Sequence, residues 1–227
     1  MGRRVARLGI ALVFMMLLGA AGWVFAISWR PSDKSYAFQG VDVSERNGPI
    51  DWMTLHGTGT GADFGYIRAT YGADGRDTRF AANWSDAYAA DVRRGAIHEY
   101  SLCRLAVDQA NNFNTVVPPV SDALPAAVSI DFTGDCSDRP ERSVLIGEVK
   151  RFMTMVEAHT GKPVLLMTSK RLEAAYRLSA DIPRPVWSAQ DFFPPDYAAR
   201  PWRMWRANDM RRVEGMEGPV NWDVVAP

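Results

Sequence analysis

The chain has 227 residues, enough for one sizeable domain with its own hydrophobic core. Lysine and arginine together number 26, as do aspartate and glutamate, so the total charge gives no sign of a nucleic-acid-binding or acidic-substrate-binding protein. Three of the basic residues, Arg3, Arg4 and Arg7, lie at the very start, which leaves the rest of the chain mildly acidic.

An uncharged apolar segment, residues 8–27, follows these arginines and is long enough to span a bilayer as a helix. Arginines on its N-terminal side favour a cytoplasmic N-terminus and an exported remainder. We therefore expect a basic cytoplasmic tip (1–7), a single-pass inner-membrane anchor, a polar linker (28–37) and a periplasmic domain (38–227). The alternative is a cleaved signal peptide and a secreted protein. Such a peptide has an apolar region of about 7–15 residues that ends in an A-x-A-like site, and "VFAISW" matches that site weakly.

In the exported part, strand-like and helix-like segments alternate. Strands are expected at 37–44, 63–70, 96–102, 126–132, 162–169, 184–189, 200–208 and 218–225. Helices are expected at 78–95, 107–117, 141–159 and 170–179, the first closed by Gly95 and the third by Gly161. About eight strands, with helices between the first five only, are typical of an α/β protein with a parallel sheet closed into a TIM-like barrel.

Two cysteines, Cys103 and Cys136, follow the third and fourth strands. Export favours a disulfide between them, beside the ends of these strands, over two separate buried thiols. A single cysteine pair with three scattered histidines does not suggest a metal site.

In such barrels, functional side chains gather at the C-terminal ends of the strands. The residues that meet this description are Asp42, His98, Tyr100, Ser129, Asp131, Trp187, Trp205, Asn221 and Asp223. Carboxylates, amides and aromatic rings around one rim suit a carbohydrate, because rings stack on sugar faces and paired carboxylates act around a glycosidic bond.

Three segments stand out between Gln39 and Val225: "QGVDVSERNGPIDW", "DTRFAANWSDAYAADVRRGAIHEYSLCR" and "WRMWRAND…EGPVNWDVV". In this order and spacing they resemble glycoside hydrolase family 25, the Chalaropsis-type lysozymes, and the resemblance runs from Gln39 to Val225. It implies a barrel of eight strands and five helices that cleaves the β-1,4 bond between N-acetylmuramic acid and N-acetylglucosamine. The partner is then peptidoglycan, with no cofactor, metal or nucleic acid.

The family's Asp-x-Glu on the fourth strand falls on Ser129 and Asp131. The resemblance thus makes Asp131 a shortened general acid, with Asp42 as the second catalytic carboxylate and Ser129 as a substrate contact. Shortening Glu to Asp retracts the carboxyl by about 1.5 Å, and a misplacement of about 1 Å can cost on the order of 10²-fold in rate. The alternative for Asp131 is a residue that caps the turn before "TGDC".

The other rim residues are expected to bind substrate: His98, Tyr100, Trp187, Trp205 and Asn221, with Asp223 as an alternative to Asn221. Glu99 stands where the family usually has an aromatic residue, which suggests a replacement acid, but strand alternation turns it away from the face of His98. We therefore do not place Glu99 in the site.

Two functions remain open. One is a membrane-anchored muramidase with a degraded site, favoured by Asp42, Asp131, Trp187 and Trp205. The other is a catalytically inactive peptidoglycan-binding or scaffold protein on the same barrel, favoured by Ser129, Asn221, Arg206 and Ala207.

Overall fold

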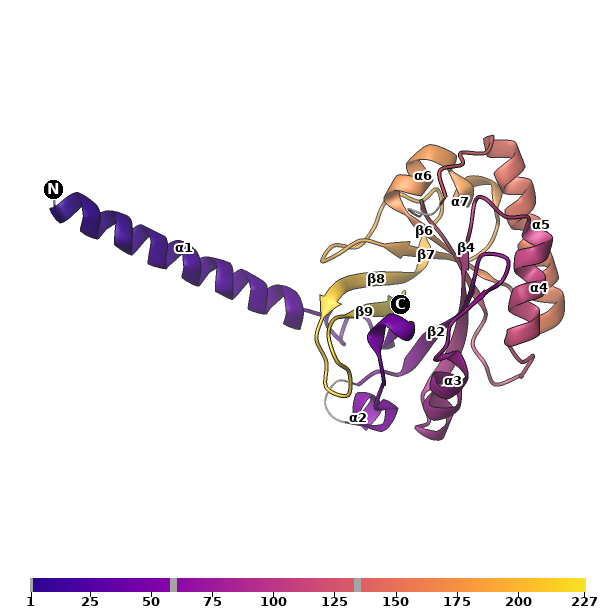
Figure 1. Ribbon diagram of the computed structural model, residues 1–227, viewed down its shortest axis with the longest axis horizontal. Helices are drawn as coiled ribbons and strands as arrows, with labels where there is room; N and C mark the ends of the chain where they lie inside the picture. The colour runs from indigo at the N-terminus through magenta and orange to yellow at the C-terminus, as the bar shows by residue number, and fades with distance from the viewer. Residues whose placement is uncertain (1, 58–60, 133–135) are drawn as a thin grey trace.

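The computed structural model describes residues 2–57, 61–132 and 136–227 (Figure 1). Its centre is a closed eight-stranded barrel of order β1-β9-β8-β7-β6-β5-β4-β2, closed by pairing of β1 with β2. The strands are β1 Gln39–Val43, β2 Phe64–Tyr71, β4 Arg93–Tyr100, β5 Ala127–Ile130, β6 Leu165–Ser169, β7 Val186–Ala189, β8 Trp202–Arg211 and β9 Val220–Val225. A two-residue strand, β3 (Gly75–Arg76), extends β2. The predicted α/β barrel of about eight strands is confirmed.

One strand departs from the expected parallel arrangement. β9 runs antiparallel to both β8 and β1, whereas the other six barrel pairings are parallel. No helix separates β8 from β9, and a short connection permits only an antiparallel return.

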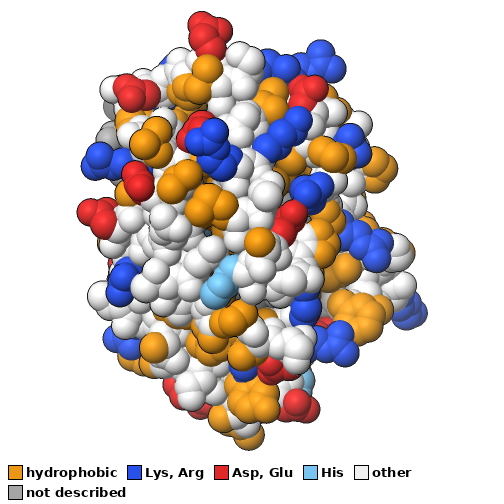
Figure 2. All heavy atoms as spheres, turned by 90° about the vertical axis from the view of Figure 1, so that its right-hand side faces the viewer, with side chains coloured by type: hydrophobic (Ala, Val, Ile, Leu, Met, Phe, Trp, Pro, Cys, Tyr) orange, Lys and Arg blue, Asp and Glu red, His pale blue; other side chains and the backbone are white. Residues whose placement is uncertain are grey.

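The helices lie outside the barrel. They are α2 Trp52–Gly57, α3 Phe80–Ala89, α4 Ala106–Val116, α5 Arg142–Thr160, α6 Lys170–Tyr176 and α7 Leu178–Asp181, with a 3-10 turn at Glu45–Asn47 and the N-terminal helix α1, Gly2–Ser28. Helices α4 and α5 pack side by side along one flank (Figure 1). Figure 2 views this flank, and its acidic and basic side chains are interspersed rather than gathered by sign.

The predicted stop of the first barrel helix at Gly95 is wrong. Helix α3 ends at Ala89, and Gly95 lies inside β4. A Cβ atom at this glycine would come within 2.4 Å of the Tyr66 ring in the barrel interior, so close packing rather than a helix cap requires glycine here. Gly161 does end α5 in the left-handed conformation, as expected.

The predicted disulfide between Cys103 and Cys136 is present, with the two Cα atoms 5.8 Å apart. It ties the segment after β4 to the segment after β5, at the carboxyl end of the barrel. The cross-link therefore fixes Cys103 and Cys136 relative to each other at this end of the barrel.

Helix α1 contains a stretch, Gly9–Ser28, that is long and apolar enough to cross a membrane and is not buried by the rest of the protein. Its C-terminal end is fastened to β8. The side-chain amide of Asn208 donates to the Ala26 carbonyl (2.8 Å) and the Trp29 carbonyl (2.9 Å), and the Arg212 amide donates to the Ile27 carbonyl (2.8 Å). The segment predicted as a linker also packs on the barrel, because the Trp29 ring contacts Phe192 and Trp205.

Candidate active site

Two adjoining cavities, of about 670 and 180 Å³, open at the carboxyl end of the parallel strands. Arg46, Arg68 and Glu99 line both of them. We call the two cavities together the cleft. Its position at this end of the barrel is the one expected for a functional site.

Asp42, at the end of β1, lines the smaller cavity and is held by an extensive set of donors. The guanidinium of Arg206 donates to both carboxylate oxygens (2.8 and 2.7 Å), and the Asn221 side-chain amide donates to Oδ1 (2.8 Å). Strand register explains the meeting, because Asn221 is directly opposite Asp42 across β1 and β9. The Asp42 side chain is 8% exposed and that of Arg206 is 23% exposed, so this is a largely buried, two-pronged ion pair.

Asp223 lies one layer below, inside the barrel, where Trp187 Nε1 donates to its Oδ1 (3.0 Å). Its Oδ2 has no hydrogen-bond partner within the part of the chain that the structure describes. Burial and the neighbouring Asp42 carboxylate raise the pKa of Asp223 well above its ordinary value. Of the two candidates on the last strand, only Asn221 lines the cleft.

Ser129 and Asp131 lie at different depths. Ser129 lines the smaller cavity, whereas Asp131 follows the end of β5 at the rim and is not among the described residues that line the cleft. Asp131 Oδ1 accepts hydrogen bonds from Ser169 Oγ (2.8 Å), Arg171 (3.1 Å) and the backbone N–H of Phe132 (2.7 Å). Its side chain is 41% exposed. The turn that Asp131 was alternatively predicted to cap, 133–135, lies outside the described residues.

His98 is not brought to the cleft. It points out of the barrel toward α4 and α5, fully buried, with its ring 4.8 Å from that of Phe152. Thr70 Oγ1 lies 2.7 Å from Nδ1, and Gln109 Oε1, which accepts from Nε2, lies 3.2 Å away. Burial lowers the pKa of His98 to about 4, so the ring is neutral at pH 7. The substrate-facing role predicted for His98 is therefore not supported by its position, which is that of a hydrogen-bonded core histidine.

Tyr100, two residues on, shares this outward face and packs edge-on against Phe152. Its side chain is almost fully buried, although the residue contributes to the wall of the larger cavity. Burial is the main cause that raises the pKa of its hydroxyl.

Trp187 and Trp205 are also buried, and neither is among the described residues that line the cleft. The Trp187 ring stacks obliquely on Tyr66 in the barrel interior, with centroids 4.9 Å apart. Trp205 lies on the outside of β8 and donates its indole N–H to the Gln190 carbonyl (2.6 Å). The structure thus brings neither ring to a surface on which a sugar can stack.

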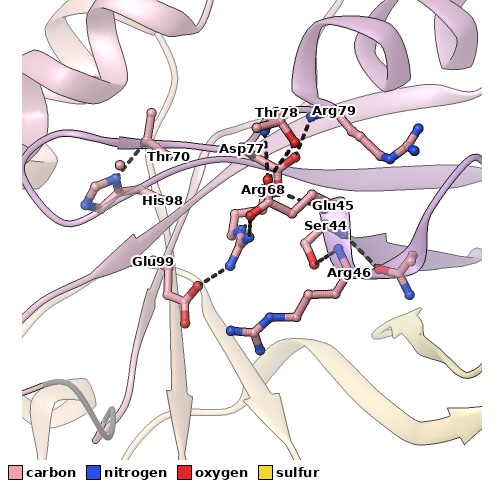
Figure 3. A network of polar contacts seen from close by, with 12 residues as sticks. Ser44, Glu45, Arg46, Arg68, Thr70, Asp77, Thr78, Arg79, His98 and Glu99 are labelled. Atoms are coloured by element: carbon pink, nitrogen blue, oxygen red, sulfur yellow. Dashed lines mark hydrogen bonds and ion pairs between the residues drawn. The ribbon is translucent and has the colours of Figure 1, made fainter.

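Glu99 is not placed in the site by its sequence pattern, but in the structure this residue lines both cavities. Alternation along β4 does separate it from His98, but His98 is the residue that faces outward, so Glu99 faces the cleft (Figure 3). The register of the structure explains this position: Glu99 pairs with Ser129 across β4 and β5, and paired residues share a face.

Glu99 belongs to a network built around the Arg68 guanidinium (Figure 3). Arg68 contacts Glu99 (2.8 Å), Glu45 (3.1 Å) and the buried Asp77 (3.1 Å). Although burial alone would lower it, hydrogen bonds and charge from Glu99 and Asp77 raise the pKa of Arg68. The network therefore holds a charged guanidinium beneath the cleft.

The similarity of this chain to known proteins agrees with its fold. The sequence model of the glycosyl hydrolases family 25 matches residues 41–216. The chain is 29% identical over 194 residues to the uncharacterized protein YegX of Escherichia coli K12, covering 84% of this chain and 70% of YegX. Among solved structures, a family 25 glycosyl hydrolase from Bacillus anthracis superposes with a TM-score of 0.78 at 27% identity, covering 86% of this chain and 91% of the other. A bacterial lysozyme from Streptomyces coelicolor gives 0.75 at 25% identity, over 83% and 91%.

Proposed function

The chain belongs to glycosyl hydrolase family 25, and from this premise we propose that it is a muramidase that cleaves the β-1,4 bond between N-acetylmuramic acid and N-acetylglucosamine in peptidoglycan. The observation that carries the proposal is the carboxylate-lined cleft at the carboxyl end of a barrel shared with family 25 enzymes. Hydrolysis of a glycoside needs an acid for the leaving oxygen and a carboxylate near the sugar ring, and we assign these roles to Asp131 at the rim and Asp42 in the smaller cavity.

In the proposed reaction, Asp131 at the rim protonates the glycosidic oxygen. Its position beside Ser169 on β6 fixes the side chain from a second strand. Asp42 at the floor of the smaller cavity is the second carboxylate, oriented by Arg206 and Asn221. Water then adds to the anomeric carbon, and the proton it releases restores the acid.

The test is the release of reducing ends from purified peptidoglycan by the full-length protein in detergent, with Asp131→Asn alongside. A general acid typically contributes 10²–10⁴-fold, so the variant is expected to lose at least about 10²-fold in kcat while still co-sedimenting with peptidoglycan. A variant as fast as the wild type would remove Asp131 from the mechanism.

A second function is favoured by one observation, the pairing of Asp42 with Arg206. A guanidinium bound through two hydrogen bonds offsets the negative charge that a glycosidase needs near the anomeric carbon. The same barrel would then bind peptidoglycan without turnover. In the assay above, this function predicts no release by the wild type, with wild type and variant co-sedimenting equally.

We further propose that α1 is an uncleaved anchor that holds the barrel on the periplasmic side of the inner membrane. Support comes from the end of the helix: the Ala26 and Ile27 carbonyls, at the weak cleavage motif, accept hydrogen bonds from Asn208 and Arg212. These contacts lie toward the carboxyl end of β8, the end at which the cleft opens. The anchor therefore joins the barrel on its cleft side.

The anchor is tested by mass spectrometry of the protein extracted from washed membranes. We expect a chain that retains residues 8–27, released by detergent but not by alkaline carbonate. A carbonate-soluble chain that begins after Ala26 would instead establish signal-peptide cleavage.

A further inference from the structure

We propose that Glu99 is a catalytic carboxylate of the cleft, whose negative charge faces the sugar ring and stabilises the positive charge that develops there as the glycosidic bond breaks. The inference rests on the proposed muramidase function. Glu99 forms no bond and transfers no proton: the leaving oxygen takes its proton from Asp131, and water supplies the replacement.

Position is the first argument. Among the described acidic residues, Glu99 alone lines both cavities, so it stands at their junction. Its side chain is 35% exposed, which leaves the carboxylate accessible to a ligand in the cleft. A sugar chain lying along the cleft passes this group before it reaches the floor at Asp42.

Charge is the second argument. Two of the other carboxylates that line the cleft are engaged by donors: Asp42 by Arg206 and Asn221, and Glu45 by the backbone N–H and hydroxyl of Thr78. Among the described residues, Glu99 has one ion-pair partner, the Nη1 of Arg68.

The guanidinium of Arg68 cannot cancel the charge of Glu99 by itself, because it also contacts the carboxylates of Glu45 and Asp77. Arg46 extends its guanidinium into the same space and lines both cavities (Figure 3). The charge of Glu99 is only partly offset by the shared Arg68, in a partly desolvated place where charge has more effect than in water.

Register is the third argument. Glu99 and Ser129 are paired across β4 and β5, so their side chains rise from the same face on strands about 4.8 Å apart. The longer glutamate extends past the serine hydroxyl into the smaller cavity, which both residues line. A carboxylate introduced at position 129 would thus reach the part of the smaller cavity that the Glu99 side chain lines.

The experiment compares kcat, KM and thermal unfolding of the full-length wild type, Glu99→Gln, Glu99→Asp, and Glu99→Gln combined with Ser129→Asp, on purified peptidoglycan. We expect Glu99→Gln to lose about 10²–10³-fold in kcat with KM changed less than about threefold, because the shape is kept and the charge is lost. Glu99→Asp should retain part of the rate. The added Ser129→Asp should restore at least about tenfold.

Asp77→Asn is the matched control, since it removes another carboxylate partner of Arg68 from a buried position outside both cavities. It should keep kcat within about threefold. An equal loss in Asp77→Asn and Glu99→Gln would mean that the Arg68 network acts only structurally, and would overturn the inference.

Two other outcomes would also contradict the inference, and each overturns a different claim. An active wild type with an equally active Glu99→Gln variant would overturn the role of Glu99 alone. A wild type that releases no reducing ends would overturn the muramidase function, and the inference with it.

Discussion

Replacing Arg206 by methionine is expected to lower the free energy of unfolding by about 3 kcal/mol, because it leaves the largely buried Asp42 carboxylate without its two-pronged cation. Asn221 would remain as a donor to Asp42, and one amide does not compensate for a lost guanidinium. Urea unfolding of the full-length protein in detergent, followed by tryptophan fluorescence, measures the change.

Two variants separate charge from packing in this prediction. Combining Arg206→Met with Asp42→Asn leaves no charge to bury and should recover most of the lost stability. Arg171→Met breaks an exposed pair, in which the side chains are 63% and 41% exposed, and should cost less than about 1 kcal/mol. A loss from Arg206→Met as small as that from Arg171→Met would show that the Asp42 pair is not energetically buried.

Acid should destabilise the barrel through His98. Its pKa in the folded protein is about 4, below the value of about 6.5 in the unfolded chain, so between these two pH values the unfolded chain binds the additional proton. The free energy of unfolding therefore falls as the pH is lowered from 6.5 to 4, by about 3 kcal/mol for this one residue.

His98→Gln isolates this contribution, because glutamine keeps a polar group beside Thr70 and Gln109 but does not titrate. Asp223 acts in the opposite direction, since its raised pKa makes the folded state bind a proton first. That effect is common to both proteins and cancels in their difference. The stability advantage of the wild type over His98→Gln should shrink by about 3 kcal/mol between pH 6.5 and pH 4, and a constant difference would contradict the assignment.

Much of the fold could be predicted from local patterns in the sequence. Hydrophobic periodicity and turn residues predicted all eight barrel strands and the long helix ending at Gly161, and the expected export predicted the disulfide between Cys103 and Cys136. These features depend on neighbours in sequence or on compartment chemistry, and a single sequence displays both. The sequence likewise indicated the family, because the order and spacing of its segments survive the changes in individual site residues.

What only the tertiary structure decided is which side of each strand faces the cleft. Strand alternation predicts that His98 and Glu99 point to opposite faces, but it does not predict which of them faces the barrel interior. Strands in such a barrel are covered on both the inside and the outside, so either orientation is consistent with a buried strand. The helices α4 and α5 cover the His98 face, so the charged neighbour turns inward.

The pairing of Asp42 with Arg206 could not be predicted from the sequence either, because 164 positions separate the two residues. They meet only when β9 returns antiparallel between β1 and β8 and the barrel closes. The sequence by itself thus determined the barrel, its family and the end at which the site lies. Closure of the sheet decided which cation each carboxylate pairs with, because charge compensation depends on distances across the barrel and not on spacing along the chain.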